Sequence, residues 1–426
     1  MNYKEALNWL DGFTQFGIKL GLERIKTLCE KLGSPQNNYK IIHVGGTNGK
    51  GSVCKYISSI LTKSGYKTGV YTSPHLQRFT ERIIVDGKEI SEKNVVSLIQ
   101  KIKPIIEDME KNGDPATYFE IVTALAFQYF NDKKIDFAVV EVGLGGRFDA
   151  TNIVKPILSV ITNVTLDHQS ILGDKIEDIA FEKVGIIKNK TTVITGADDH
   201  ALNVIKKKAV ETKSKLLIID DSKWKRKYFD FNGQEFLIEG LSKNYNVKTQ
   251  MLGKFQGRNI SLSLACIDNL QINGVYIDEE SIFKGIRETS FPGRMELRQR
   301  DPIILLDGAH NIKGMEVLTE TLENDFTYDD LILVIGILSD KKIEEMLKIV
   351  IPLADKVITT KSSNKRASDP NDLKRIINKI DCKKKVVVKN KISDAVNYVK
   401  VIAKKKDLVC ITGSLFTVGE ARDYLY

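Results

Sequence analysis

The sequence predicts an α/β protein of two domains, in which mostly parallel strands alternate with helices. Three observations support this fold class. The chain has 426 residues, too many for one ordinary hydrophobic core. Apolar runs of strand length alternate with segments of helical periodicity. This alternation restarts near residue 298, so we expect a first domain of residues 1–297 and a smaller, doubly wound domain of residues 298–426.

The first domain begins its sheet with KIIHV, residues 40–44. A glycine-rich turn follows, and then a helix whose apolar positions recur at helical spacing. These positions are Val53, Ile57, Ile60 and Leu61. Further strands are predicted at TGVYTS (68–73), FAVVEVG (137–143) and ILSVITN (157–163). Each run ends in polar or glycine residues, and ligands of parallel sheets gather at the carboxyl ends of strands.

The second domain repeats the alternation of strands and helices. Its predicted strands are PIILLD (302–307), LILVIG (331–336), KVITT (356–360), KVVVK (385–389) and LVCIT (408–412). Within the first domain, residues 222–258 alternate like antiparallel strands. We expect them to form a hairpin insertion at the edge of the first domain.

Composition excludes several classes of protein. A content of 42% hydrophobic and 28% charged residues is typical of globular proteins, and no apolar run approaches the roughly 18 residues that span a bilayer. The N-terminus has no basic and apolar leader, so a cytoplasmic protein with no membrane partner is expected. The five cysteines are scattered and odd in number, which predicts free, mostly buried thiols.

A net charge of +9 raises the question of nucleic-acid binding. The basic residues come mostly as lysine clusters at 206–208, 383–385 and 404–406, without interleaved aromatic residues. Such clusters are typical of solvated helix ends. We therefore expect no nucleic-acid partner.

The segment HVGGTNGKGS, residues 43–52, predicts a phosphate-binding loop. Its glycines let backbone N–H groups approach an anion, the following helix directs its positive end at it, and Lys50 adds a charge. The pattern departs from G-x-x-x-x-G-K-[ST] at Val44 and at Gly51. The hydroxyl that would normally follow the lysine is therefore missing. The residues predicted to bind a nucleotide are Gly46, Thr47, Asn48, Gly49, Lys50, Gly51 and Ser52.

Two other strand ends carry polar side chains that could face the same crevice. Glu141 ends an apolar strand, and Asp167 and His168 follow another. Glu141 could instead be an ordinary strand-end carboxylate, and His168 could be an ordinary core or surface histidine. A carboxylate is a hard oxygen ligand of the kind that magnesium prefers.

Lys183 falls on the buried stripe of a predicted helix, seven residues after Ile176. A lysine on such a stripe is costly unless it snorkels to solvent, pairs with another group or is chemically altered.

In the second domain, DGAHN places Asp307 and His310 in a turn between a strand and a helix. The preceding FPGRME (291–296) is a linker in which Arg294 is available for a phosphate. Asp307 could instead cap the helix, and Arg294 could be a surface charge.

Taken together, the motifs resemble folylpolyglutamate synthase and dihydrofolate synthase, members of the Mur ligase superfamily. The resemblance runs from LGLERI (20–25) to GSLFTVGEA (413–421), nearly the whole chain. It is carried by GTNGKGS (46–52), TSPHLQRFTERI (72–83), EVGLGGRFDATN (141–152), TNVTLDH (162–168), FEKVGIIK (181–188), FPGRME and DGAHN.

The resemblance implies roles for particular residues. Lys50 would contact the phosphates of ATP, and magnesium would be held by Ser73, Glu141 and His168. Ser73 would thus supply the hydroxyl missing after Lys50. Lys183 matches a lysine that the family carbamylates, which would turn it into a metal-binding carboxylate. Further nucleotide contacts are implied for Asn259, Arg294, Asp307 and His310, with ATP clamped between the domains, and Asp149 is a candidate for the pterin pocket.

The chain also departs from the family pattern. Phe255 stands where a histidine is common, Ile312 follows DGAHN in place of proline, and SDKK (339–342) lacks the frequent final aspartate. These departures concern adenine-side and C-terminal contacts.

The implied activity is an ATP-dependent carbon–nitrogen ligase that adds L-glutamate to folate, to dihydropteroate or to both, by way of an acyl phosphate. Lys50, His168 and Lys183 are the predicted catalytic residues, and a monomer is expected. The alternatives are a Mur-type ligase for another carboxylate and a P-loop regulatory ATPase that ligates nothing. A separate UDP-sugar domain does not fit before Gly45.

Overall fold

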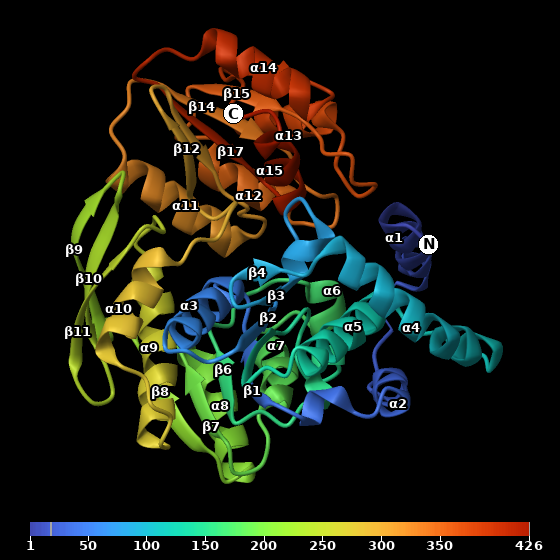
Figure 1. Cartoon of the computed structure of the whole chain (residues 1–426). Helices are drawn as coiled ribbons and strands as arrows, with labels where there is room; N and C mark the ends of the chain where they lie inside the picture. The colour runs from blue at the N-terminus through green and yellow to red at the C-terminus, as the bar shows by residue number, and fades with distance from the viewer. Residues whose placement is uncertain (18, 426) are drawn as a thin grey trace. The chain divides into compact units, whose positions relative to one another are not determined.

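The computed structural model describes residues 1–17 and 19–425. The chain divides into two compact units (Figure 1). Unit 1 comprises Met1–Lys225, Phe236–Lys248 and Gly257–Thr289. Unit 2 comprises Arg226–Glu235, Thr249–Gln256 and Ser290–Tyr426. The predicted α/β class is confirmed, whereas a domain boundary after residue 297 stays a prediction.

The main sheet of unit 1 has eight strands in the order β4-β3-β2-β5-β1-β6-β7-β8. The strands β2, β5, β1, β6, β7 and β8 are parallel, and β3 and β4 add an antiparallel edge. Their bounds are β1 Lys40–Gly45, β2 Thr68–Tyr71, β3 Ile83–Val85, β4 Lys88–Glu89, β5 Phe137–Glu141, β6 Leu158–Ile161, β7 Thr192–Thr195 and β8 Lys215–Ile218.

Strand β1 lies between β5 and β6, and its pairing with them determines which residues meet at the ends of the strands. Val44 is paired with Glu141, and Gly45 with Ile161. The carboxyl ends of β5, β1 and β6 therefore meet at one edge of the sheet, as predicted from the sequence. The three predicted strands at 68–73, 137–143 and 157–163 correspond to β2, β5 and β6.

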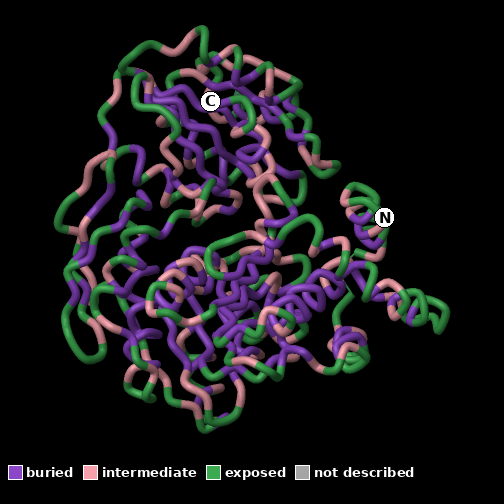
Figure 2. The backbone as a smooth tube through the Cα atoms, in the orientation of Figure 1, coloured by how far each residue is buried: buried purple, intermediate pink, exposed green. Residues whose placement is uncertain are grey.

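Helices cover the sheet because the strands are apolar on both faces. The strands form the buried interior in Figure 2. Ile41, Ala138 and Val140 pack with residues of α4 and α5 in one core. The predicted apolar face of α3 is buried at Val53, Ile57, Ile60 and Leu61. The helices of this part of the chain are α1 Tyr3–Asp11, α2 Glu23–Lys31, α3 Lys50–Lys63, α4 Glu92–Lys111, α5 Tyr118–Asp132, α6 Gln169–Leu172, α7 Ile176–Lys183, α8 Asp199–Glu211, α9 Gln256–Ile272 and α10 Glu279–Glu288.

The insertion predicted as a hairpin contains three strands instead of two. They form a separate sheet in the order β11-β10-β9. The strands are β9 Trp224–Asp230, β10 Gly233–Glu239 and β11 Asn244–Thr249. A third strand gives the sheet more backbone pairing and a larger packed face than an isolated hairpin, which is only marginally stable.

Unit 2 has its own six-stranded sheet, ordered β12-β13-β17-β14-β15-β16. Only β12 is antiparallel to its neighbour. The strands are β12 Glu296–Arg300, β13 Ile303–Leu306, β14 Leu331–Ile335, β15 Lys356–Thr359, β16 Lys385–Val388 and β17 Leu408–Thr412. The helices are α11 Ile312–Asp325, α12 Ile343–Val350, α13 Pro370–Ile380, α14 Ile392–Ile402 and α15 Leu415–Arg422. All five strands predicted for this region are present.

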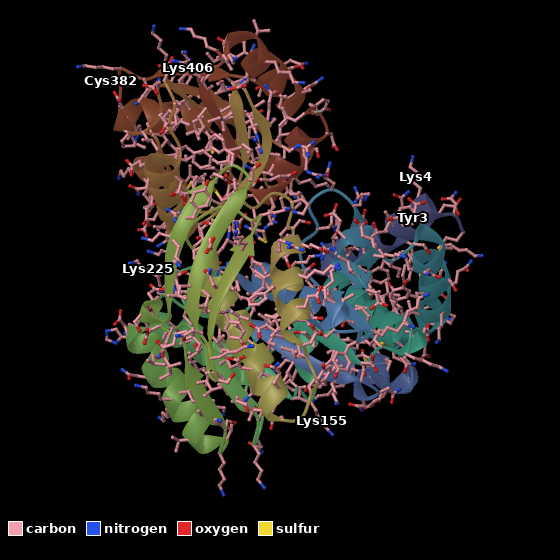
Figure 3. All side chains as sticks on the ribbon, turned by 60° about the vertical axis from the view of Figure 1, so that its left-hand side comes forward. Tyr3, Lys4, Lys155, Lys225, Cys382 and Lys406 are labelled. Atoms are coloured by element: carbon pink, nitrogen blue, oxygen red, sulfur yellow. The ribbon has the colours of Figure 1, made fainter. Side chains whose placement is uncertain are left out.

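The surface predictions are confirmed where the structure tests them. Lys406, in one of the three lysine clusters, is exposed, and so is Cys382 (Figure 3). The other four cysteines are buried and free. Within residues 1–17 and 19–425, no helix combines the length and apolarity needed to cross a membrane.

Candidate active site

The glycine-rich turn between β1 and α3 is packed so closely that two of its glycines cannot be replaced. Gly46 has a φ of +137°, and a Cβ there would lie 1.9 Å from Thr162 Oγ1. Gly49 has a φ of +83°, and a Cβ there would lie 2.5 Å from Asn259 Oδ1. Both angles are ones that side chains rarely adopt. The second contact places Asn259, a predicted nucleotide contact, directly beside the loop.

The segment after β6 supports this loop from one side. Thr47 N–H donates to the Asn163 carbonyl (3.0 Å), and Asn48 N–H donates to Asn163 Oδ1 (2.9 Å). The Thr162 hydroxyl donates to the Asn48 carbonyl (2.7 Å), and Thr165 N–H donates to Thr47 Oγ1 (3.0 Å). Sequence reasoning missed this supporting role, although the polar TNVT at a strand end was a signal for it.

Lys50 is the first residue of α3, and its ammonium group donates to the carbonyl of Thr47 (3.0 Å). Gly51 and Ser52 follow and are buried. The first N–H groups of a helix have no partner within the helix, and they carry its positive dipole end. The loop and α3 therefore form a suitable site for an anion such as a phosphate.

Ser73 and Glu141 lie together at the carboxyl ends of neighbouring strands. The pairing of Tyr71 with Val140 brings their chains side by side, and Ser73 N–H donates to Glu141 Oε2 (3.1 Å). Glu141 is 6% exposed. A hydroxyl and a buried carboxylate are hard oxygen donors that fit magnesium. Over the described part of the chain, no group of three or more His, Cys, Asp or Glu residues is clustered as a metal centre, so the ligand set stays a prediction.

His168 follows β6 at the start of the short helix α6. It has a φ of +52°, a left-handed conformation that histidine adopts more readily than most residues. Its N–H donates to Asp167 Oδ1 (2.8 Å), and its Nε2 lies 3.9 Å from the same oxygen. The backbone of this turn therefore directs the ring and the carboxylate of adjacent residues toward each other.

Lys183 is the last residue of α7, and it is 4% exposed. Its Nζ donates to the carbonyl of Gly46 over 2.9 Å, so the side chain reaches the phosphate loop. Burial lowers the pKa of Lys183 to about 7, and the positive charge of Lys50 lowers it further. The negative charges of Asp167 and Asp149 oppose this shift. A large fraction of Lys183 is thus a neutral amine near pH 7. The snorkelling alternative is wrong, because the amine is buried and hydrogen-bonded.

Asp149 is buried in the turn that follows β5. Its oxygens accept hydrogen bonds from Leu144 N–H (2.8 Å), from Thr151 N–H (3.0 Å) and from the Thr151 hydroxyl. Burial raises the pKa of Asp149, and these hydrogen bonds oppose the rise. The turn itself is held against α7, because Arg147 N–H donates to the Glu182 carbonyl (2.7 Å) and Arg147 Nη2 to Glu182 Oε1 (2.7 Å).

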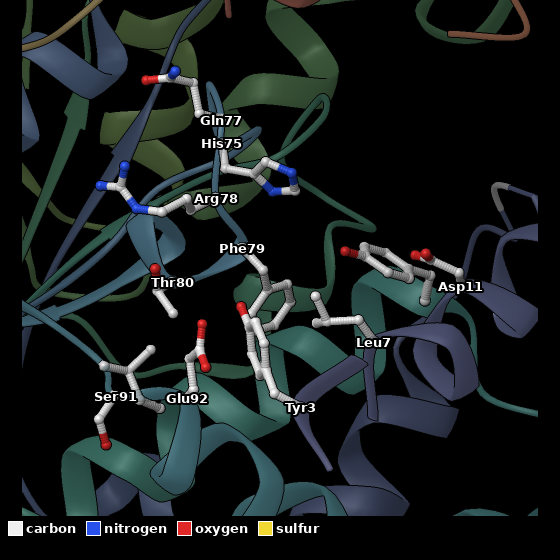
Figure 4. A pocket seen from close by; sticks show the side chains of 12 residues that line it. Tyr3, Leu7, Asp11, His75, Gln77, Arg78, Phe79, Thr80, Ser91 and Glu92 are labelled. Carbon is white, nitrogen blue, oxygen red and sulfur yellow. The ribbon is translucent and has the colours of Figure 1, made fainter. Parts of the chain in front are cut away.

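A pocket of about 490 Å³ lies between α1, the loop after Ser73 and the starts of α4 and α5 (Figure 4). Arg82 Nε–H donates to His75 Nδ1 (2.7 Å), so His75 is neutral and carries its proton on Nε2. Residues of α1 line this pocket, whereas residues 147–151 do not. The lining residues are Tyr3, Leu7, Asp11, His75, Gln77, Arg78, Phe79, Thr80, Ile90, Ser91, Glu92 and Tyr118.

Unit 2 brings its three predicted nucleotide contacts together. Asp307 accepts from Met295 N–H (2.9 Å) and Ala309 N–H (2.9 Å). Burial raises the pKa of Asp307, and the charge of Arg294 opposes this rise. His310 Nδ1 lies 2.8 Å from the Gly308 carbonyl.

The helix caps of unit 2 are other residues. Asn311 caps α11, so the alternative that Asp307 is the cap is wrong. Ser414, in the segment GSLFTVGEA (413–421), caps α15 by accepting from Thr417 N–H (3.1 Å).

Two family models match the chain. The Mur ligase middle domain matches residues 44–267, and the Mur ligase glutamate ligase domain matches residues 293–415. The first match contains the phosphate loop, Glu141, His168 and Lys183, and the second contains Asp307 and His310.

Relatives extend over the whole chain. Dihydrofolate synthase/folylpolyglutamate synthase of Bacillus subtilis is 37% identical over 438 residues, covering 99% of both chains. Dihydrofolate synthetase of Saccharomyces cerevisiae is 32% identical over 426 residues, covering 95% of this chain and 97% of its own.

Solved structures show the same fold. Folylpolyglutamate synthase of Mycobacterium tuberculosis complexed with ADP has a TM-score of 0.92 and 31% identity, covering 99% of this chain and 98% of that one. FolC of E. coli in complex with DHPP and ADP has a TM-score of 0.87 and 29% identity, covering 99% and 97%. The predicted resemblance is confirmed: the chain belongs to the dihydrofolate synthase/folylpolyglutamate synthase family of Mur ligases, which are ATP-dependent ligases.

Proposed function

We propose that this protein adds L-glutamate to folates in an ATP-dependent amide synthesis, and that it also accepts dihydropteroate. The observation that carries the proposal is the convergence of Lys183, Glu141 and Ser73 on the edge of the sheet that holds the phosphate loop. The names of the relatives support the choice of acceptor. One structural relative is complexed with ADP, which supports ATP as the nucleotide.

ATP phosphates would be bound by the loop amides and Lys50. The candidate contacts are those predicted from the sequence: Gly46, Thr47, Asn48, Gly49, Lys50, Gly51 and Ser52, with Asn259, Arg294, Asp307 and His310. The N–H groups at the start of α3 would stabilise the negative charge that develops on the transferring phosphoryl group. Stabilising that charge lowers the barrier to transfer.

Magnesium would be held by Ser73, Glu141 and His168, whose oxygen and imidazole donors fit a hard divalent ion. When bound, magnesium neutralises part of the negative charge of the phosphates. Lys183 is the candidate for carbamylation, because its buried amine is partly neutral near pH 7 and a neutral amine is the form that attacks CO2. A carbamate would convert this buried amine beside Gly46 into a carboxylate.

The reaction would proceed in two steps. A carboxylate oxygen of the acceptor attacks the γ-phosphorus of ATP, which releases ADP and gives an acyl phosphate. The amine of L-glutamate then attacks the acyl carbon, and inorganic phosphate leaves with the amide formed and a proton lost. An acyl phosphate hydrolyses in water, so the residues around it must exclude solvent.

The acceptor would be recognised in unit 1. Asp149 is the candidate to accept hydrogen bonds from the pterin, and the pocket of Figure 4, which Asp149 does not line, is a second candidate region for the acceptor. We expect a cytoplasmic monomer.

A non-ligating P-loop ATPase is the alternative from another class. It would use the loop and magnesium, but it gives no role to the buried Lys183 or to a domain of the glutamate ligase type. ATP turnover without any acceptor would favour it.

The decisive experiment is a paired ligation assay with purified protein, MgATP and L-glutamate. One tube contains dihydropteroate and the other tetrahydrofolate, and products are identified by mass spectrometry. Addition of one glutamate in both tubes is the expected result. Addition in one tube only would restrict the protein to that acceptor. ATP consumption without addition in either tube would overturn the proposed acceptors.

A further inference from the structure

The turn that follows β5 packs closely against the C-terminal end of α7. A Cβ on Gly146 would lie 2.8 Å from the carbonyl oxygen of Glu182. A Cβ on Gly185, just after α7, would lie 2.3 Å from Arg147 Cα. Asn152 Nδ2 donates to the carbonyls of Arg147 (2.9 Å) and Gly185 (3.0 Å), so it joins the turn to the residues after the helix. The end of α7 therefore cannot shift unless this turn shifts with it.

The side chain of Arg147 holds the outer face of α7. Its Nη2 donates to Glu182 Oε1 over 2.7 Å. The guanidinium carbon lies 4.8 Å from the ring centroid of Phe181, and Phe148 flanks the same guanidinium at 4.4 Å. An ion pair and a cation–π contact thus act on two successive residues of the helix. We call Arg147, Phe181 and Glu182 the α7 clamp.

Lys183 lies on the opposite face of the same helical turn. With about 3.6 residues per turn, positions 181 and 183 point about 200° apart. Phe181 is exposed, whereas Lys183 is buried and donates to the carbonyl of Gly46. Because α7 has only eight residues, Ile176–Lys183, its stability depends on tertiary contacts of this kind. The α7 clamp holds the outer side of the helix end, while the amine on its inner side reaches the phosphate loop.

We propose that Arg147 is a positioning residue, which fixes the end of α7 so that the Lys183 amine is held beside the phosphate loop for carbamylation. This inference rests on the part of the proposed function that makes Lys183 the carbamylated lysine. In that step the nitrogen lone pair attacks the carbon of CO2, and an N–C bond forms. One C=O electron pair moves onto its oxygen, and the nitrogen loses a proton to solvent. An amine already held in place loses less conformational freedom when the resulting carboxylate is ordered.

The test measures the carbamate on Lys183 directly. Each protein is equilibrated with carbon-13-labelled bicarbonate at fixed pH, and the carbamate carbon is observed by NMR. A signal that is lost in Lys183→Ala belongs to this residue.

Arg147→Met removes the guanidinium but keeps an apolar stem and the backbone N–H bond to Glu182. We expect the bicarbonate concentration for half-maximal signal to rise about 3- to 10-fold, as for the loss of one partly exposed ion pair and one cation–π contact. Arg147→Lys, which keeps the positive charge, should lie between Arg147→Met and the wild type.

Ligation kinetics give a second readout. At limiting bicarbonate, the kcat of Arg147→Met should fall by a similar factor, and at saturating bicarbonate it should recover. The KM of ATP should stay unchanged, because the contacts of Thr47 and Asn48 with Asn163 are kept. A general loss of stability would not be reversed by bicarbonate.

Arg422→Met is the matched control. Arg422 also forms a partly buried ion pair with a glutamate, because its Nε donates to the two carboxylate oxygens of Glu296 over 3.0 Å and 3.2 Å. Both residues belong to unit 2. This variant should lose some thermal stability while its bicarbonate requirement stays at the wild-type value.

Three outcomes would count against the proposals, and each acts on a different part. A lower melting temperature of Arg147→Met with an unchanged bicarbonate requirement would show that Arg147 is only structural. A wild-type protein without a carbamate signal would overturn this inference together with the carbamylation of Lys183. A wild-type protein that carries the carbamate but ligates neither acceptor would remove the proposed function alone, because the NMR signal does not depend on the acceptor.

Discussion

The ammonium nitrogen of Lys183 lies 2.9 Å from the carbonyl oxygen of Gly46. The two residues are 137 positions apart, and the contact joins the end of α7 to the phosphate loop. Gly46 can take its backbone conformation only because it lacks a Cβ. A hydrogen bond thus joins a buried amine to the loop that is predicted to bind phosphate.

Replacing Lys183 by alanine should reduce ligation at least about 100-fold while leaving the fold intact. The amine is the candidate for carbamylation, and it donates to the carbonyl of Gly46 in the phosphate loop. The measurement is the glutamate-addition rate, with circular dichroism and the melting temperature as checks of folding. Near-normal ligation by the folded variant would contradict the assignment.

His168→Ala should also abolish most turnover. The imidazole is a candidate metal ligand, and it is partly exposed, so its removal leaves no buried cavity. Initial rates at several magnesium concentrations would measure the effect. His200→Ala is a suitable control, because His200 is an exposed surface histidine paired with Glu177.

Gly46→Ala should abolish nucleotide binding and destabilise the protein by several kcal/mol, roughly the size of a severe packing clash. Its Cβ would meet Thr162 Oγ1 at 1.9 Å. Gly65→Ala is the matched control, since Gly65 has a φ of +87° with open space around it. The control should cost about 1–2 kcal/mol and leave ATP binding unchanged. ATP titration and urea unfolding measure both effects, and equal results for the two variants would refute the argument.

Ser73→Ala should raise the magnesium concentration needed for half-maximal rate several-fold. The predicted ligand is the hydroxyl, whereas the contact with Glu141 is made by the backbone N–H and survives the substitution. Ser91→Ala, which removes only the cap of α4, should cost about 1 kcal/mol of stability without changing the magnesium requirement. An unchanged requirement in Ser73→Ala would leave Ser73 without a metal role.

His43→Gln should make the stability of the protein less sensitive to acid. The pKa of His43 is about 3 in the folded state, against about 6.5 in an unfolded chain. Between these values the unfolded state binds one proton more, so the contribution of His43 is complete above pH 6.5 and is lost as the pH falls toward 3. The slope of this loss approaches about 1.4 kcal/mol per pH unit. Unfolding free energies of both proteins between pH 4 and 8 would test this, and parallel curves would contradict it.

Local patterns in the sequence determined the α/β class, most of the parallel strands and the buried stripe that contains Lys183. These features depend on periodicity and on glycine placement, which neighbouring residues specify by themselves. The ordered motifs also determined the family. By contrast, the three-stranded form of residues 224–249 was missed, because alternation alone does not give the number of strands.

The tertiary structure alone decided which distant side chains meet. The register that pairs Val44 with Glu141 and Gly45 with Ile161 brings the TNVT segment under the phosphate loop and Ser73 beside Glu141. The same packing joins His43 to Thr151 and Lys183 to Gly46. A hydrogen bond between residues more than 100 positions apart depends on strand order and register, and these are set by the packing of the whole core rather than by any local stretch of sequence.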